Sequence, residues 1–186
     1  MTALVLVPVP AASAMTWVRR GVVACHVAEE QGWTLVTSAD GRAAAAEPYD
    51  DPTTVLLARP VGPRSAPSIG VGVVGDRAVV VTQASGWRTI RRWTVRPRTG
   101  PVARTSLPHL RPGDLTPFAP GVGSREVTDL LEERTLPAHE WLATLLETLR
   151  LPGADVVRGE HPPGPVVEPD ARSLTAFARV VEDGRP

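Results

Sequence analysis

An alternating stretch near the middle of the chain limits the folds that this sequence can adopt. Residues 78–82 are apolar and mostly β-branched, which favours a buried strand, and a Ser-Gly turn follows. From residue 87 the side chains alternate in character up to Pro97, which has no N–H for a β-ladder. We therefore predict an antiparallel hairpin in which strand 77–84 pairs with strand 87–95.

The second strand of this hairpin carries the strongest candidate binding residues. Two tryptophans share one face of the strand with an arginine, and three arginines line the opposite face. Aromatic side chains interleaved with arginine suit nucleic-acid binding, but they also pack well in sheet cores, and core packing is the favoured interpretation of the tryptophans. The candidate binding residues are Trp87, Arg88, Arg91, Arg92, Trp93, Arg96 and Arg98.

Charge is distributed unevenly along the chain, although the formal net charge is zero. Residues 77–113 contain eight arginines and no acidic residue, whereas residues 114–186 contain seven arginines and thirteen acidic residues. The basic segment either pairs with acidic C-terminal helices or faces solvent and binds a polyanion. Pairing is slightly favoured, because the acidic third of the chain would repel a nucleic acid.

The hydrophobic pattern predicts an α+β fold of the size of a single domain. An N-terminal strand–helix–strand leads into a mainly antiparallel sheet of five or six strands, and C-terminal helices pack on one face. Residues 1–122 contain the sheet, and residues 123–186 form a helical segment of the same domain. Besides the hairpin, the expected strands are 3–9, 33–37, 53–58 and 69–74, and the expected helices are 13–31, 125–135, 137–150 and 172–181.

Two proline-rich segments interrupt this pattern. Residues 97–122 hold six prolines and are too long for a simple connector, which makes them a candidate functional loop. Ser106, His109 and Asp114 lie in this loop and are residue types that hydrolases use, but an ordinary polar loop is the favoured interpretation. Residues 159–169 are expected to be a stiff linker.

Other motifs give no support for catalysis or for a cofactor. The letters G-x-G-x-x-G at residues 70–75 lack the strand-then-helix context of a dinucleotide site, so we interpret them as a strand that ends in a turn. Cys25 is expected to be a buried thiol on a helix, with the neighbouring His26 pointing elsewhere. His139 and Glu140 do not continue into H-E-x-x-H, and no metal or other cofactor is expected.

Amino-acid composition indicates the cellular compartment and the type of organism. The single cysteine excludes an intramolecular disulfide, and no apolar run reaches the ~18 residues of a membrane span, so we expect a cytoplasmic protein. The chain has no lysine or asparagine and only two isoleucines, which is typical of a bacterium with a GC-rich genome.

These observations predict a non-enzymatic protein-interaction module, such as an adaptor, a chaperone-like protein or a regulatory protein, with another protein as its partner. The alternatives are nucleic-acid binding through the arginine-rich segment 88–111 and an enzyme whose site is built from the 97–122 loop. The sequence does not indicate an oligomeric state.

Overall fold

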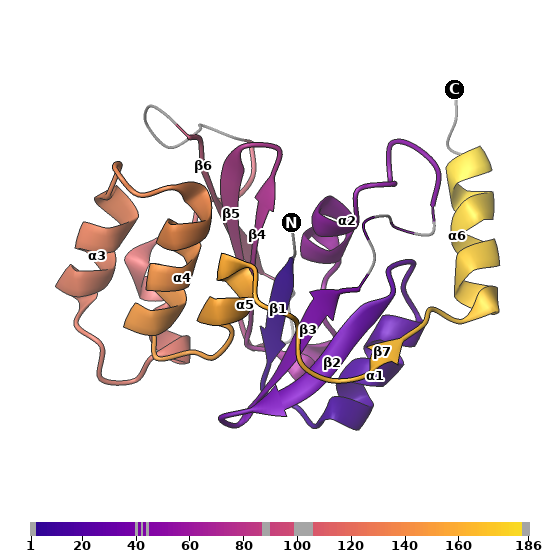
Figure 1. Ribbon diagram of the computed structural model, residues 1–186, viewed down its shortest axis with the longest axis horizontal. Helices are drawn as coiled ribbons and strands as arrows, with labels where there is room; N and C mark the ends of the chain where they lie inside the picture. Colours follow the sequence, from indigo (N-terminus) through magenta and orange to yellow (C-terminus); the bar gives the residue numbers. More distant parts are fainter. Residues whose placement is uncertain are drawn as a thin grey trace.

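The computed structural model describes residues 3–39, 41, 43, 45–86, 90–98 and 106–183. Within these ranges, seven strands form one antiparallel sheet in the order β6-β5-β4-β1-β3-β2-β7 (Figure 1). The strands are β1 (Leu4–Val7), β2 (Cys25–Glu30), β3 (Trp33–Ser38), β4 (Ser68–Val74), β5 (Arg77–Gln83), β6 (Arg91–Arg96) and β7 (Val166–Val167).

Six α-helices accompany the sheet in the described part of the chain. They are α1 (Ala11–Arg19), α2 (Pro52–Ala58), α3 (Ser124–Glu132), α4 (Ala138–Thr148), α5 (Ala154–Arg158) and α6 (Ala171–Asp183). Three short 3₁₀ turns, η1 (Pro63–Ser65), η2 (Pro112–Asp114) and η3 (Thr116–Phe118), lie in the connections.

The two faces of the sheet pack against different sets of helices (Figure 1). On one face, α3, α4 and α5 cover a core that includes Leu4, Leu35, Val80 and the fully buried Trp141. On the other face, α1 and α2 cover a second core that includes Val5, and α6 lies on this side of the molecule. The predicted α+β fold is therefore confirmed, with α3 to α5 as the C-terminal helices that share one face.

The central hairpin is confirmed in the residues that the structure describes. Strand β5 pairs antiparallel with β6, and Val80 lies opposite Thr94. The second strand, β6, begins at Arg91 rather than at the predicted residue 87, since Ile90 is described and lies outside the strand; residues 87–89, including Trp87 and Arg88, lie outside the described residues. Side chains alternate along β6, so Arg92 and Arg96 face the α3–α4 layer while Arg91 and Trp93 face α2.

The predicted long helix 13–31 is wrong. Helix α1 ends at Arg19, and residues 25–30 form β2, which pairs with β3. Gln31 and Gly32 connect these strands with φ values of 50° and 81°, as a two-residue hairpin turn of type I′ requires. Cys25 and Val27 are the buried residues of β2 and alternate along it, and Gly32 lies in the hairpin turn to β3.

The predicted strand 53–58 is also wrong, because this segment is α2. The Asp51 carboxylate accepts hydrogen bonds from the backbone N–H of Thr53 at 3.1 Å and of Thr54 at 3.0 Å, which is an N-cap. Pro52 occupies the first helical turn, where its missing N–H costs nothing. The β-branched residues 53–55 suggested a strand, but the Asp-Pro pair that precedes them specifies a helix start.

The G-x-G-x-x-G letters lie in β4 and the turn after it, as the sequence predicted. A side chain at Gly70 would come within 2.9 Å of Leu57 Cδ2 on α2 and within 2.8 Å of Val81 Cγ1 on β5. Glycine is therefore needed here because α2 packs directly on the sheet, and not because a phosphate approaches the backbone.

The two proline-rich segments contribute more structure than the sequence suggested. The expected linker 159–169 contains β7, which adds a seventh strand by pairing with Cys25 and His26 of β2. In the described part of the 97–122 segment, Leu110 and Leu115 are almost fully buried beneath the C-terminal helices. This half of the segment is thus irregular in conformation but packed in the core.

Candidate functional site

Among the predicted binding residues that the structure describes, Arg96 is the most buried, with 2% of its surface exposed. Its guanidinium donates to a carboxylate oxygen of Glu133 at 3.2 Å and to the backbone oxygen of Leu136 at 2.9 Å, and it lies 5.2 Å from the ring of Trp141. Burial lowers the pKa of Arg96, and the charge of Glu133 opposes this effect. Arg96 thus joins the basic strand to the acidic C-terminal part of the chain.

The remaining described candidates on and after β6 differ in exposure. Arg92 is half-buried and forms an ion pair with Asp114 at 3.2 Å. Trp93 lies beneath the guanidinium of Arg91, 4.6 Å from its central carbon, and packs against the second core. Arg98 is exposed. The described part of β6 therefore presents no continuous row of solvent-facing arginines.

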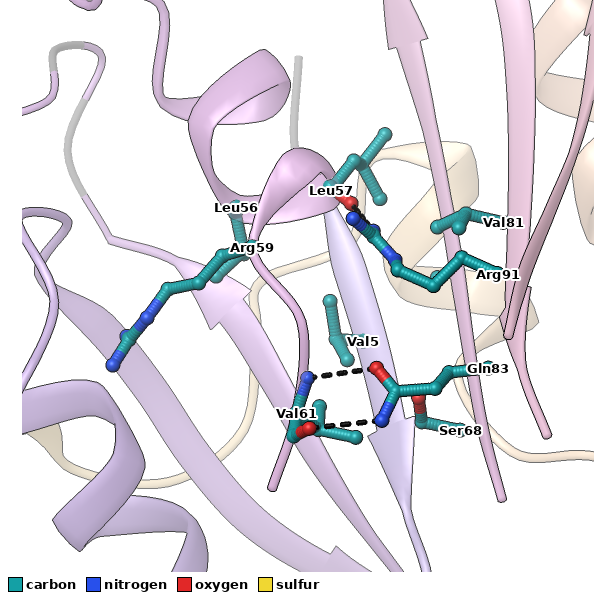
Figure 2. Close-up of a pocket in the computed structure, with 10 residues that line it drawn as sticks. Val5, Leu56, Leu57, Arg59, Val61, Ser68, Val81, Gln83 and Arg91 are labelled. Atoms are coloured by element: carbon teal, nitrogen blue, oxygen red, sulfur yellow. Dashed lines mark hydrogen bonds between the residues drawn. The ribbon is translucent and has the colours of Figure 1, made fainter. Parts of the chain in front are cut away.

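Arg91 stabilises the end of α2. Its guanidinium donates hydrogen bonds to the backbone oxygens of Leu57 and Ala58, which belong to the last turn of α2, where a positive charge is favourable (Figure 2). Burial lowers the pKa of Arg91 to about 10. Beside it, the Gln83 amide bonds with both backbone groups of Val61, at 3.0 Å and 2.8 Å. The cavity among these groups has a volume of only about 10 Å³, too small for a ligand. Arg91 and Gln83 therefore have a structural role: they fix α2 and its C-terminal connection against the sheet.

The residue types considered for catalysis are not assembled into a site in the described part of the chain. Asp114 binds Arg92 and the backbone N–H of Arg111, while Ser106 and His109 are exposed. Cys25 is fully buried in β2, and His26 is only partly buried; as neighbours on a strand they point to opposite faces. Among the described residues, no group of three His, Cys, Asp or Glu side chains could hold a metal ion.

A groove between α2 and α6 is the most promising binding site in the structure. Its volume is about 640 Å³, within the range of about 300–1,000 Å³ that is common for ligand sites. Its lining includes Val55 on α2, Phe177 on α6, the 48–49 loop and residues of the α1–β2 turn. Most of the lining is apolar, and Tyr49 and Val180 are exposed on it, by 44% and 68%.

Two contacts hold α6 beside this groove. The backbone N–H of Asp170, just before α6, donates to the backbone oxygen of Arg19 at 2.7 Å. The rings of Tyr49 and Phe177 meet edge to face, with their centroids 5.4 Å apart. Although α6 is amphipathic, none of its residues is fully buried. The apolar face of α6 is therefore shared between the core and the groove.

Arginine is the charged residue type that lines the groove. Arg20 follows α1, and Arg59 follows α2. The Arg59 guanidinium donates to the backbone oxygen of Trp17 at 2.6 Å and lies 4.4 Å from the centre of the Trp17 ring. Burial lowers the pKa of Arg59 to about 10. A group with a perturbed pKa beside an apolar hollow is a common property of binding sites.

Sequence reasoning missed this groove. Its lining comes from four separated segments, and one of them, α2, was expected to be a strand. The only local indication was the pattern of α6, whose apolar side contains more residues than its packing buries.

In comparisons with protein-family models, curated proteins and solved structures, none matches the chain. No helix in the described ranges combines the length and the apolar character needed to cross a membrane.

Proposed function

We propose that this protein is a non-enzymatic protein-interaction module that docks a segment of another protein in the groove between α2 and α6. The observation that carries the proposal is the apolar groove itself, of about 640 Å³, with Tyr49 and Val180 exposed on it. Apolar surface of this kind gains free energy when a partner removes it from water.

The lining residues favour a protein segment as the occupant. Tyrosine and arginine are enriched at protein interfaces, because each combines a large contact area with hydrogen-bonding groups. Tyr49 is supported by Phe177, and Arg59 by Trp17, so both side chains are held in place before a partner arrives. Such preorganisation lowers the entropy lost on binding. A docking groove of this type supports the proposal of an adaptor or regulatory role.

A selection from random peptides tests the proposal and does not require an identified partner. The immobilised protein is presented with a phage-displayed library of random peptides, in parallel with two variants of α6. In Ala176→Trp the new ring occupies the groove, because Ala176 is exposed and lines it. In Thr175→Trp the same ring is added at an exposed neighbouring residue that does not line the groove.

We expect peptides to be enriched on the wild type and on Thr175→Trp, and to be lost on Ala176→Trp. The individual peptides should bind with micromolar dissociation constants, measured by isothermal titration calorimetry. A library without enriched peptides, or peptides that bind all three proteins equally, would contradict the proposed docking groove.

A further inference from the structure

The groove contains two arginines whose charge is not matched by an acidic side chain. In the described part of the chain, arginine forms ion pairs at positions 92, 96, 125 and 158, and not at positions 20 or 59. Burial is the main cause of the lowered pKa of Arg59, and the charge of Arg20 lowers this pKa further. Two like charges beside an apolar surface attract an anion, because an anion removes their repulsion.

The position of Arg59 keeps most of its hydrogen-bonding capacity available. Of its five N–H donors, one is used by a side-chain hydrogen bond in the described residues, the bond to the backbone oxygen of Trp17. The side chain leaves the end of α2 in the direction away from Arg91 and the Gln83–Val61 pair (Figure 2). Gly21 leaves room for the guanidinium, because a Cβ there would overlap Nη1. The fold thus holds a charged fork at the groove.

We infer that the groove recognises a carboxylate on the docked segment through Arg20 and Arg59, while the apolar lining binds neighbouring apolar side chains of the same segment. This inference rests on the proposed function and specifies the chemistry of the partner: an acidic residue or a C-terminus flanked by apolar residues. A guanidinium binds a carboxylate through two parallel hydrogen bonds, which fixes direction as well as charge.

A carboxylate fits this environment better than a phosphate group. The cost of removing an ion from water rises steeply with its charge, so a group close to −2 is disfavoured beside the apolar lining of α2 and α6. A carboxylate of charge −1 meets the same two arginines at a smaller desolvation cost.

Three small probes with the same alkyl chain separate the charge from the apolar contact. Octanoate, octan-1-ol and octyl phosphate are titrated into the wild-type protein, and dissociation constants are measured by chemical-shift changes in NMR spectra. We expect octanoate to bind roughly tenfold more tightly than the alcohol, the factor of a single charged hydrogen bond. Octanoate should also bind more tightly than octyl phosphate. Added salt should weaken the binding of octanoate and leave that of octan-1-ol unchanged.

Variants then assign the effect to the two arginines. Arg20→Met removes an exposed charge and should leave the protein folded, while the preference for octanoate over octan-1-ol falls below about twofold. Arg59→Lys keeps the charge but loses the fork and should retain part of the preference. Gly21→Ala keeps both charges but displaces the Arg59 guanidinium, so it should also reduce the preference. Arg125→Met, at an exposed position on α3, is the matched control and should change nothing.

The outcomes distinguish this inference from the proposed function. Equal binding of octanoate and octan-1-ol, or tighter binding of octyl phosphate, would overturn carboxylate recognition even if the peptide selection succeeds. A preference for octanoate that survives Arg20→Met and Gly21→Ala would overturn the assignment to these residues. A preference that depends on Arg20, together with a failed peptide selection, would support the anion site and contradict protein docking.

Discussion

Arg96 and Glu133 form an ion pair that connects the edge of the sheet to the end of α3, with 3.2 Å between Nη2 and Oε2. Only 2% of the Arg96 side chain is exposed, and the same guanidinium also binds the backbone oxygens of Glu133 and Leu136. A positive charge at this position is stable because three acceptors surround it. The pair therefore holds the helical layer against β6.

Replacing Arg96 with methionine should destabilise the protein by about 3 kcal/mol, since it leaves a carboxylate and buried carbonyl groups without their donor. Urea denaturation measures the change. Arg92→Met is the control: Arg92 is 35% exposed in its pair with Asp114, and its loss should cost less than about 1 kcal/mol. Equal effects of the two substitutions would contradict a structural role that is specific to Arg96.

Acid should weaken the same connection. Although burial opposes the effect, hydrogen bonds from Thr135 and Leu136 and the charge of Arg96 lower the pKa of Glu133. A carboxyl group whose pKa is lower in the folded state adds stability above its unfolded pKa, about 4.3, and loses this contribution as the pH falls through the folded value. Melting temperatures measured between about pH 7 and pH 3 should therefore fall less steeply for Glu133→Gln than for the wild type. Parallel curves would show that Glu133 does not contribute.

Even a methyl side chain at position 70 should destabilise the protein. In Gly70→Ala the new methyl group would lie within 3 Å of Leu57 and Val81, so α2 must move away from the sheet. Overpacking of this kind costs about 1–3 kcal/mol. Gly113→Ala is the control, because a Cβ there meets no atom within 4 Å. Thermal unfolding of both variants tests the prediction, and an unchanged melting temperature for Gly70→Ala would show that α2 is not packed so closely.

Nucleic acid should bind weakly to this protein. Arg91 and Arg96 are occupied by backbone and carboxylate acceptors, which leaves few guanidinium groups on β6 for phosphates. We expect no retention on a heparin column at about 0.15 M salt, where several phosphate contacts would be needed. If the protein is retained, and substitution of Arg88 and Arg92 by alanine abolishes retention without lowering the melting temperature, the nucleic-acid alternative is supported.

The sequence alone determined the elements whose periodicity is unambiguous. The β-branched run and turn of β4 and β5 specified a buried meander, and the leucines around Trp141 at helical spacing specified α4. For the basic strand, the sequence slightly favoured pairing with acidic C-terminal residues over exposure to solvent, and in the structure Arg96 lies beside Glu133. These features follow from local spacing and from the sign of the charge.

Tertiary structure decided the elements whose local pattern fits two conformations. Cys25 and Val27 lie on a strand because β2 can pair with β3 on one side and with β7 on the other, a gain that no local pattern records. The groove between α2 and α6 also depends on tertiary structure. It exists because α6 lies beside α2, more than 110 residues away in the chain, and its lining includes Arg20 and Arg59, which follow two different helices. Such a site depends on long-range packing, whereas sequence periodicity reports only which side of each element is apolar.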